Sequence, residues 1–171
     1  MKKTLAVCLT VLTACATVNP APQTRDAEVQ KAAADALTGF VDSWNRAATG
    51  DMQAPAQYGD LYWPDAELVD PLGNIWKGRS AIMQTHVDLW HTVFKGSSIK
   101  GSVRNTRRLS PTLMIADFDL LLASFKEAPS GGKEANGLIR AHLKHVMEKR
   151  SGAWKVISAQ NTFYSDVPPT R

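Results

Sequence analysis

The chain has 171 residues, of which 44% are hydrophobic and 21% are charged. This composition suits one globular domain that buries roughly two thirds of its unfolded surface. The net charge is +4, and two of the basic residues, Lys2 and Lys3, stand at the very start. The small remaining excess excludes a bulk nucleic-acid-binding surface, so we expect no nucleic-acid partner.

The first residues have the pattern of an export signal. Lys2 and Lys3 are followed by a short apolar run over residues 4–12, which is too short to stay as a membrane-spanning helix. The run ends in Leu-Thr-Ala-Cys, which resembles the lipobox of bacterial lipoproteins. That resemblance implies that residues 1–14 are removed and that Cys15 carries lipid, because several acyl chains together hold a protein on a membrane.

The residue after the lipid site bears on the destination. In enterobacterial lipoproteins an Asp at this position tends to retain the protein at the inner membrane. Ala16 stands there instead, so we expect the protein in the cell envelope at the outer membrane, facing the periplasm. The alternative is ordinary cleavage after the Ala-x-Ala pattern at residues 14–16, which would release a soluble periplasmic protein. Cys8 and Cys15 are the only cysteines, so the folded part has no disulfide. Residues 15–25, with two prolines, read as a tether.

Two helices are predicted next. Asp26 is a favoured N-cap residue, and apolar side chains then recur at helical spacing until Gly50. A shorter helix, capped by Asp51, is predicted through Ala56 to about Leu61, with Pro55 near its first turn, and Pro64 interrupts the pattern. A hairpin follows, with strands at 66–69 and 75–77 around the turn at Asp70.

The clearest helix is predicted over residues 79–94, with Ile82, His86 and Trp90 on its apolar face. From Ile99 the period changes to two. Strands are predicted over 99–109, 113–126, 138–150 and 153–164, with a mobile loop at 127–136 and a tail at 165–171. Helices followed by an antiparallel meander form an α+β pattern, and a long curved sheet around helices makes a cone with a pocket on its concave face.

The order of these elements and several motifs resemble one superfamily. The motifs are Asp-Ala-Glu-Leu-Val-Asp at 65–70, Trp-Lys-Gly-Arg at 76–79 and Gly-Ala-Trp-Lys-Val at 152–156. Together they resemble the SnoaL-like and SgcJ/EcaC branch of the nuclear-transport-factor-2-like superfamily over residues 26–164. The resemblance implies a cone fold and a pocket used by isomerases, cyclases, dehydratases, hydrolases or plain binding modules. No dinucleotide fingerprint accompanies it, so we expect no cofactor.

Two residues are candidates for catalysis. His86 lies on the buried stripe of the best helix, where it is either a proton-transferring group or a hydrogen-bonded core residue. Asp70 is either a pocket acid whose pKa is raised by burial or the cap of the turn before Pro71. His145 lies on the apolar face of its strand and has the same two interpretations.

Candidate ligand-binding residues come from the aromatic side chains and the last strands. Tyr62, Trp63 and Trp90 are expected to line the pocket, because aromatic walls favour flat or apolar ligands. His145 and Gln160 are expected to supply polar contacts there. Gln160 shares the parity of Trp154, which places it inside and Asn161 outside; a bulge would reverse the two.

Other sites are not predicted. The four histidines have no ligand-spaced carboxylate or cysteine partner, so we expect no metal. Two functions remain open. One is an envelope-anchored protein that binds a small apolar or aromatic ligand, which we favour; the other is an acid–base enzyme of the isomerase, dehydratase or hydrolase type. Long side chains on one sheet face, Ile115, Leu121 and Phe125, together with the superfamily's habit, predict a homodimer.

Overall fold

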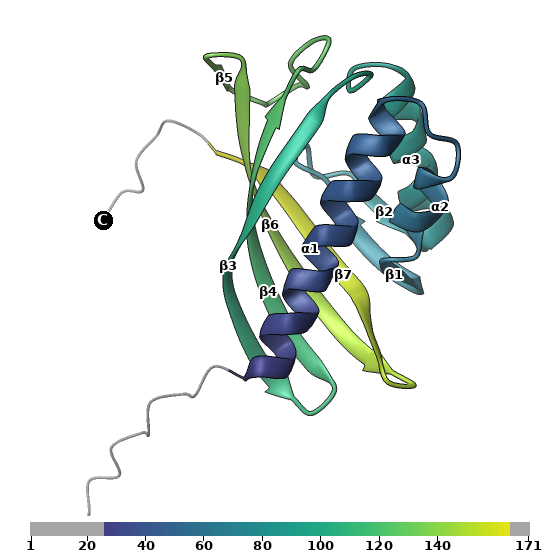
Figure 1. Cartoon of the computed structure of the whole chain (residues 1–171), viewed down its shortest axis with the longest axis vertical. Helices are drawn as coiled ribbons and strands as arrows, with labels where there is room; N and C mark the ends of the chain where they lie inside the picture. The colour runs from purple at the N-terminus through teal and green to yellow at the C-terminus, as the bar shows by residue number, and fades with distance from the viewer. Residues whose placement is uncertain (1–25, 165–171) are drawn as a thin grey trace, which may run out of the picture.

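A computed structural model describes residues 26–164 (Figure 1). The helices are α1 (Ala27–Ala48), α2 (Ala54–Gly59) and α3 (Arg79–His91). The strands are β1 (Tyr62–Val69), β2 (Ile75–Lys77), β3 (Ser98–Ser110), β4 (Leu113–Ala123), β5 (Glu134–Ala135), β6 (Leu138–Arg150) and β7 (Ala153–Phe163). The predicted signal at 1–14, the lipid site Cys15, the tether and the tail at 165–171 lie outside the described residues.

The strands form one curved sheet in the order β2-β1-β7-β6-β4-β3, with β5 beside β6. The run β3-β4-β6-β7 is the predicted antiparallel meander. One pairing differs from that prediction, because β1 runs parallel to β7. A parallel pair requires a long crossover, and the chain between β1 and β7 supplies it with β2, α3 and the meander itself.

β1 begins four residues before the predicted strand, at Tyr62, although Pro64 lies inside it. Proline is tolerated in a strand where the ladder is irregular. The pairing of β1 with β7 shifts register between Tyr62 and Glu67, and Pro64 falls in that interval. The proline that was expected to break the pattern therefore bends the strand without ending it.

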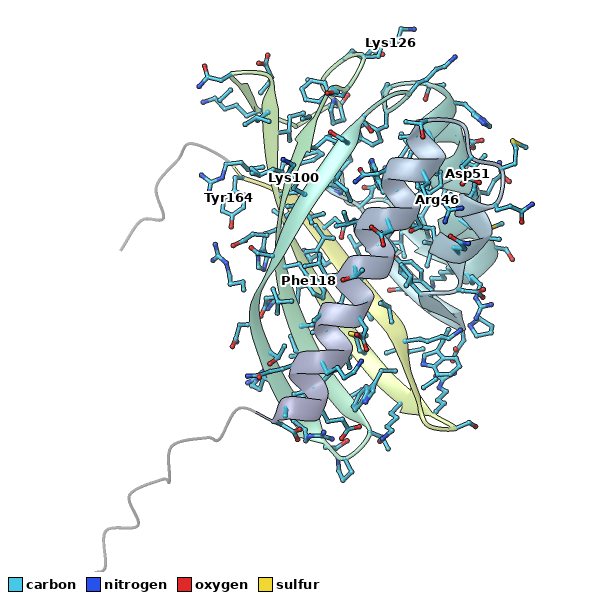
Figure 2. All side chains as sticks on the ribbon, in the orientation of Figure 1. Arg46, Asp51, Lys100, Phe118, Lys126 and Tyr164 are labelled. Carbon is cyan, nitrogen blue, oxygen red and sulfur yellow. The ribbon has the colours of Figure 1, made fainter. Side chains whose placement is uncertain are left out.

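Helix α1 lies across the concave face of the sheet (Figure 1). Alternate residues of β4 point toward it and are buried, among them Met114, Ala116 and Phe118. Figure 2 shows Phe118 beneath α1 and Tyr164 on the other side of the sheet. The apolar faces of sheet and helix thus form one core, and the predicted α+β cone is confirmed.

Both ends of α1 are tied to the sheet. At its start the Asp26 side chain caps the helix by accepting from the Glu28 backbone N–H (3.0 Å), and Arg108 of β3 bonds to both carboxylates. Near its end Asn45 exchanges two hydrogen bonds with the backbone of Ile99, at 2.7 and 3.1 Å. The helix is thereby fixed in register along the whole length of β3.

Helix α3 covers the β1 side of the cone. It starts after Gly78, whose φ of 84° is in the region that favours glycine, and it buries Ile82, His86 and Trp90 as predicted. It ends at His91, three residues before the predicted end, yet Phe94 in the following turn is still buried. Within residues 26–164, none of the helices is both long and apolar enough to cross a membrane.

The outer face of the sheet carries linked charges. Asp117 and Asp119 of β4 both contact His142 of β6, and Arg104 of β3 bonds to Asp119 at 2.8 Å. Leu121 lies beside them and is 41% exposed. The homodimer predicted through this face stays a prediction.

Candidate functional site

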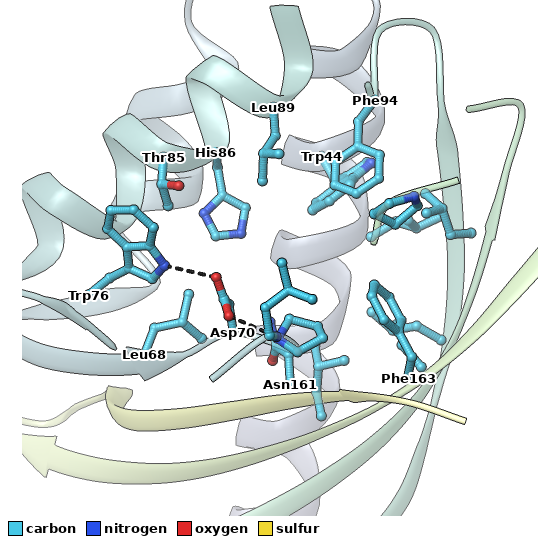
Figure 3. A pocket seen from close by; sticks show the side chains of 18 of the residues that line it. Trp44, Leu68, Asp70, Trp76, Thr85, His86, Leu89, Phe94, Asn161 and Phe163 are labelled. Carbon is cyan, nitrogen blue, oxygen red and sulfur yellow. Dashed lines mark hydrogen bonds between the residues drawn. The ribbon is translucent and has the colours of Figure 1, made fainter. Parts of the chain in front are cut away.

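An apolar cavity of about 160 Å³ lies between α1, α3 and the sheet (Figure 3). Its walls come from elements that are far apart in the sequence. The aromatic wall residues are Phe40, Trp44, Trp76, Phe94 and Phe163, and the aliphatic ones include Leu68, Leu89, Leu120, Leu122 and Leu143. The cavity is therefore a gap left by large side chains converging from the helices and the inner face of the sheet.

Two loops contribute further wall residues. Pro71 and Leu72 come from the turn after β1, and Pro129 and Ser130 come from the loop between β4 and β5. Leu72 is 58% exposed although it lines the cavity. A Cβ built on Gly131 would lie 3.4 Å from the Leu72 side chain, so the two loops nearly touch. Leu72 therefore belongs both to the protein surface and to the cavity wall.

His86 lines this cavity from α3, but both of its ring nitrogens have partners. Nδ1 is 2.7 Å from the backbone oxygen of Ile82, and Nε2 is 2.8 Å from the Tyr58 hydroxyl. Since a carbonyl only accepts, Nδ1 carries the proton and Nε2 accepts from Tyr58. Burial lowers the pKa of His86 to about 4, against smaller opposing effects of the Ile82 carbonyl and the Asp70 charge. The imidazole is therefore neutral at neutral pH.

Asp70 lines the same cavity from the turn after β1. Its Oδ1 accepts from the backbone N–H groups of Leu72 and Asn74, both at 2.9 Å. Its Oδ2 accepts from the Asn74 side chain (2.9 Å) and from Trp76 Nε1 (3.3 Å). Partial burial raises the pKa of Asp70, but these hydrogen bonds outweigh it and the pKa lies below its usual value.

The turn itself explains why an aspartate stands at position 70. The chain reverses through Gly73, whose φ is 86°, and the Gly73 N–H bonds to the Asp70 backbone oxygen at 3.0 Å. The Asp70 carboxylate holds the other N–H groups of the turn together. Of the two interpretations of Asp70, the structure supports the turn cap, at a position that also faces the cavity.

Asn161, not Gln160, reaches the cavity from β7. The pairing of β6 and β7 shifts register between Val146 and Met147, and this bulge inverts the parity of β7 after Val156. Gln160 is exposed on the outer face, so its predicted place in the pocket is wrong. The alternation of apolar and polar residues in the sequence does not reveal the bulge. With the bulge included, the same alternation places Asn161 on the inner face, as the sequence analysis noted.

The amide of Asn161 is the unusual polar group of the cavity. Its Oδ1 is buried and has no hydrogen-bond partner among residues 26–164. Figure 3 shows Asn161 extending from β7 toward the space below His86 and beside Asp70. Buried polar atoms in native proteins are nearly always paired, so this acceptor is an exception among residues 26–164.

His145 and Tyr62 do not line this cavity. They lie at a separate small void, deeper under α1, with Phe40 between the two spaces. Burial lowers the pKa of His145 to about 4, and its Nε2 has no partner in the part of the chain that is described. The Tyr62 hydroxyl lies 3.3 Å from that of Tyr58. His145 and Tyr62 were both expected to line the pocket, and the structure places neither of them at this cavity.

The two predicted tryptophans also lie elsewhere. Trp90 is buried in the core, where it packs edge-to-face on Tyr58 (5.2 Å) and Trp44 (5.6 Å). Trp63 stands outside, with Arg150 5.1 Å from its ring and its Nε1 bonded to the backbone of β6. Trp44 and Trp76 line the cavity in their place. Amphipathic spacing marked these positions as apolar but did not separate cavity walls from packed core.

Metal chemistry has no support in the geometry. Within residues 26–164, no group of three His, Cys, Asp or Glu side chains is arranged to hold a metal ion. What the cavity can do follows from its walls: it can enclose an apolar molecule and contact it with aromatic rings.

Comparison with known proteins identifies the fold. No family model and no curated protein matches the sequence. Several solved structures match the structure of this chain. A Caulobacter vibrioides protein with a cystatin-like fold has a TM-score of 0.68 at 22% identity, over 82% of this chain and 92% of that one. A ketosteroid isomerase-like protein from Erwinia carotovora atroseptica SCRI1043 has a TM-score of 0.62 at 14% identity, over 82% and 98%.

A third structure is that of an enzyme. The hexachlorocyclohexane dehydrochlorinase of Novosphingobium barchaimii LL02 has a TM-score of 0.60 at 17% identity, over 80% of this chain and 86% of that one. The chain therefore has the nuclear-transport-factor-2-like, or cystatin-like, fold that the sequence resemblance predicts. At these identities the likeness concerns the fold alone, since one fold serves many chemistries.

Proposed function

We propose that this protein is an envelope-anchored binding protein, which holds a small apolar or aromatic ligand in the cavity without converting it. The observation that carries this proposal is that the two titratable groups of the cavity are already committed. His86 uses both ring nitrogens, and Asp70 accepts four hydrogen bonds. A general base needs a free lone pair and a pKa near the working pH, and neither residue has both.

The cavity walls support a ligand that is mostly apolar. Burial of apolar ligand surface against the aromatic and aliphatic side chains would contribute roughly 25 cal/mol for each Å² removed from water. Leu72 and Pro129 line the cavity from two loops, and we propose that a ligand enters between these loops. The fold neighbours are consistent with use of a pocket, because they include a hexachlorocyclohexane dehydrochlorinase and a ketosteroid isomerase-like protein.

Envelope anchoring rests on the sequence before residue 26. The apolar run and the Leu-Thr-Ala-Cys motif support lipid on Cys15, with the domain held at the outer membrane by the tether. Mass spectrometry of the protein isolated from its own cells tests this. We expect a mature chain that begins at Cys15 with the added mass of acyl chains, and an unmodified chain beginning at Thr17 would sink the idea.

A second candidate function is acid–base catalysis of the isomerase, dehydratase or hydrolase type. The observation in its favour is that Asp70 and His86 share one cavity. In that case ligand binding would have to displace Tyr58 from His86 Nε2 and free the base. Asn161 would then replace Gln160 and His145 as the group next to the substrate.

One experiment separates binding from catalysis. The native protein is purified from its own envelope and analysed by native mass spectrometry beside two variants, Ala141→Phe, which fills the cavity, and Ala135→Phe, on exposed β5. We expect a ligand on the parent and on Ala135→Phe but not on Ala141→Phe. The recovered ligand is then incubated with fresh protein. Recovery of the unchanged ligand supports binding alone. Conversion of the ligand by the parent protein, lost in His86→Gln, supports the enzyme.

A further inference from the structure

The charge at the cavity restricts the chemistry of its ligand. Within residues 26–164 the lining side chains include no lysine or arginine, and burial lowers the pKa of the lining histidine, His86, to about 4, so it is neutral at neutral pH. Asp70 is the carboxylate of the lining. Partial burial raises its pKa, but its hydrogen bonds outweigh burial, so it is ionised. The cavity wall therefore carries a negative charge that no lining cation balances.

Asp70 offers a ligand this charge without a free acceptor site. It accepts four hydrogen bonds from uncharged donors, which are the backbone N–H groups of Leu72 and Asn74, the Asn74 side chain and Trp76 Nε1. Two bonds to each oxygen occupy the lone pairs of the carboxylate. Neutral donors stabilise the charge but do not cancel it, so a cation close to Asp70 is still attracted.

Aromatic rings line the same space. They come from α1 (Phe40 and Trp44), β2 (Trp76), the turn after α3 (Phe94) and β7 (Phe163). The Trp76 indole contacts Asp70, because its Nε1 donates to Oδ2 at 3.3 Å (Figure 3). The faces of aromatic rings carry partial negative charge and attract cations within about 6 Å of the ring centre. The rings and the carboxylate therefore favour the same sign of charge in a ligand.

The size of the cavity and the state of Asp70 select the kind of cation. The volume of about 160 Å³ is close to that of engineered apolar cavities that take up benzene, so an occupant contacts several walls at once. An ammonium with N–H groups would lose hydrogen bonds to water and find no free acceptor on Asp70. A quaternary ammonium has no N–H group. It presents methyl groups to the walls and so combines positive charge with an apolar surface.

We infer that the ligand is a small quaternary ammonium compound, whose methyl groups pack on the aromatic walls and whose charge lies beside Asp70. The inference rests on the proposed binding function and names the ligand class of the same cavity. Asp70 is then a specificity residue as well as the cap of its turn, since its charge attracts a permanent cation and repels an acid. The Trp76 ring, bonded to Asp70, forms the wall beside the charge.

The test compares two molecules of one shape. Choline and 3,3-dimethylbutan-1-ol differ in their central atom, which is a charged nitrogen in choline and a neutral carbon in the alcohol. Isothermal titration calorimetry of the full mature protein measures both affinities. We expect choline to bind at least about tenfold more tightly, because only the cation gains from the rings and from the Asp70 charge. Protonated dimethylethanolamine, which carries an N–H group, should bind more weakly than choline.

Phosphocholine distinguishes two sources of the same group, a free quaternary ammonium compound and a lipid headgroup. We expect phosphocholine to bind more weakly than choline, because the lining residues offer its phosphate no lysine or arginine. This result would support the free compound. Equal affinity would also support a quaternary ammonium ligand, but would assign it to a headgroup whose phosphate stays outside the cavity.

Variants locate the charge. Asp70→Asn should lose the preference for choline and keep its affinity for the alcohol, whereas Asp88→Asn removes the same charge at an exposed position on α3 and should match the parent. Because Asp70 also caps its turn, a second pair serves if Asp70→Asn is not folded by circular dichroism. Leu72→Lys, at an exposed position of the cavity wall, adds a competing cation and should weaken choline binding, and Leu72→Gln, its neutral control, should not.

The remaining outcomes keep this inference apart from the proposed function. Equal affinity for choline and the alcohol would reject the cation and leave apolar binding in the cavity intact. A choline preference that survives in Asp70→Asn and Leu72→Lys would overturn the role of Asp70. Tighter binding of dimethylethanolamine than of choline would overturn the quaternary ammonium. If no probe binds at millimolar concentration, the inference fails, and the native mass spectrometry with Ala141→Phe judges the binding function independently.

Discussion

The two ends of α1 meet the sheet in opposite ways. At its start, side chains of three strands converge: Glu28 accepts from Arg108 (2.6 Å), Lys149 (2.7 Å) and Trp154 (2.9 Å). Beneath this ion-pair end, Met114 and Met147 are almost fully buried. At the other end, Trp44 and Phe40 border the cavity. The chain thus fills one end of the cone with long flexible side chains and leaves space at the other.

The difference indicates where function resides. Interiors are packed at the density of organic crystals, so a cavity of this size is a loss of packing that stability alone does not explain. At the ion-pair end, by contrast, charged side chains tie the start of the helix to the sheet. We therefore expect that substitutions at the ion-pair end change stability, and that substitutions at the cavity end change binding more than stability.

The largest expected effect compares two truncations. Met147→Ala should lower the free energy of unfolding by about 3 kcal/mol, because the side chain is 1% exposed and leaves a new void. Leu89→Ala should lower it by less than about 2 kcal/mol, because Leu89 is partly exposed and borders space that already exists. Urea unfolding curves with equal slopes measure both. Equal losses would show that the two ends are packed alike.

Sequence reasoning predicted the fold better than it predicted the site, for a physical reason. Helical spacing reports only which face is buried, and it correctly placed His86 inward on α3. Cavity and packed core look the same in that pattern, so Trp90 was selected and Trp44 was not. Strand parity reports a face only as long as the ladder is regular. The bulge in the β6–β7 pairing exchanged Gln160 for Asn161, and no local residue signals it.

The next effect tests the two buried histidines, one at the cavity and one beneath α1. Burial lowers the pKa of His86 and His145 to about 4 from 6.5. The unfolded chain therefore binds more protons between these values, and stability falls as pH falls from about 6.5 toward 4. From pH 7 to pH 5, each histidine should cost about 2 kcal/mol of unfolding free energy.

Urea unfolding at pH 7 and pH 5 measures this loss. His86→Gln and His145→Gln should each reduce the difference between the two pH values, and His91→Gln, at an exposed position on α3, controls for the substitution itself. If both variants keep the full pH dependence of the parent, neither histidine is buried as a neutral group. If only His86→Gln keeps it, the cavity admits enough water to solvate that imidazole.

A smaller effect has the opposite sign. Asn161→Leu should raise the free energy of unfolding by about 1 kcal/mol, because it removes a buried acceptor that has no partner in the described chain. Such a gain is typical of residues kept for function at the expense of stability. Gln160→Leu should change it by less than about 0.5 kcal/mol, since the side chain is exposed. A loss of stability in Asn161→Leu would mean that the amide is held by bonds within the protein.

The smallest effect concerns Glu28 at the ion-pair end. Hydrogen bonds from Lys149, then Trp154 and Arg108, lower the pKa of Glu28 to about 2 from 4.5. A carboxylate whose pKa is lower in the folded state adds stability above its unfolded pKa, and that stability is lost as pH falls through the folded value. Glu28→Gln should therefore melt lower than the parent at pH 7, and the gap should close between pH 4.5 and pH 2.

Exposure keeps this effect small. The Glu28 side chain is 46% exposed, so solvent and salt screen its ion pairs, and we expect a shift in melting temperature of less than about 3 °C. Added salt should reduce the shift further. Glu127→Gln, in the exposed loop after β4, makes the same change of charge and should not shift melting. A Glu28→Gln shift that survives 1 M salt would show that charge is not its cause and would assign it to altered geometry of the hydrogen bonds around residue 28.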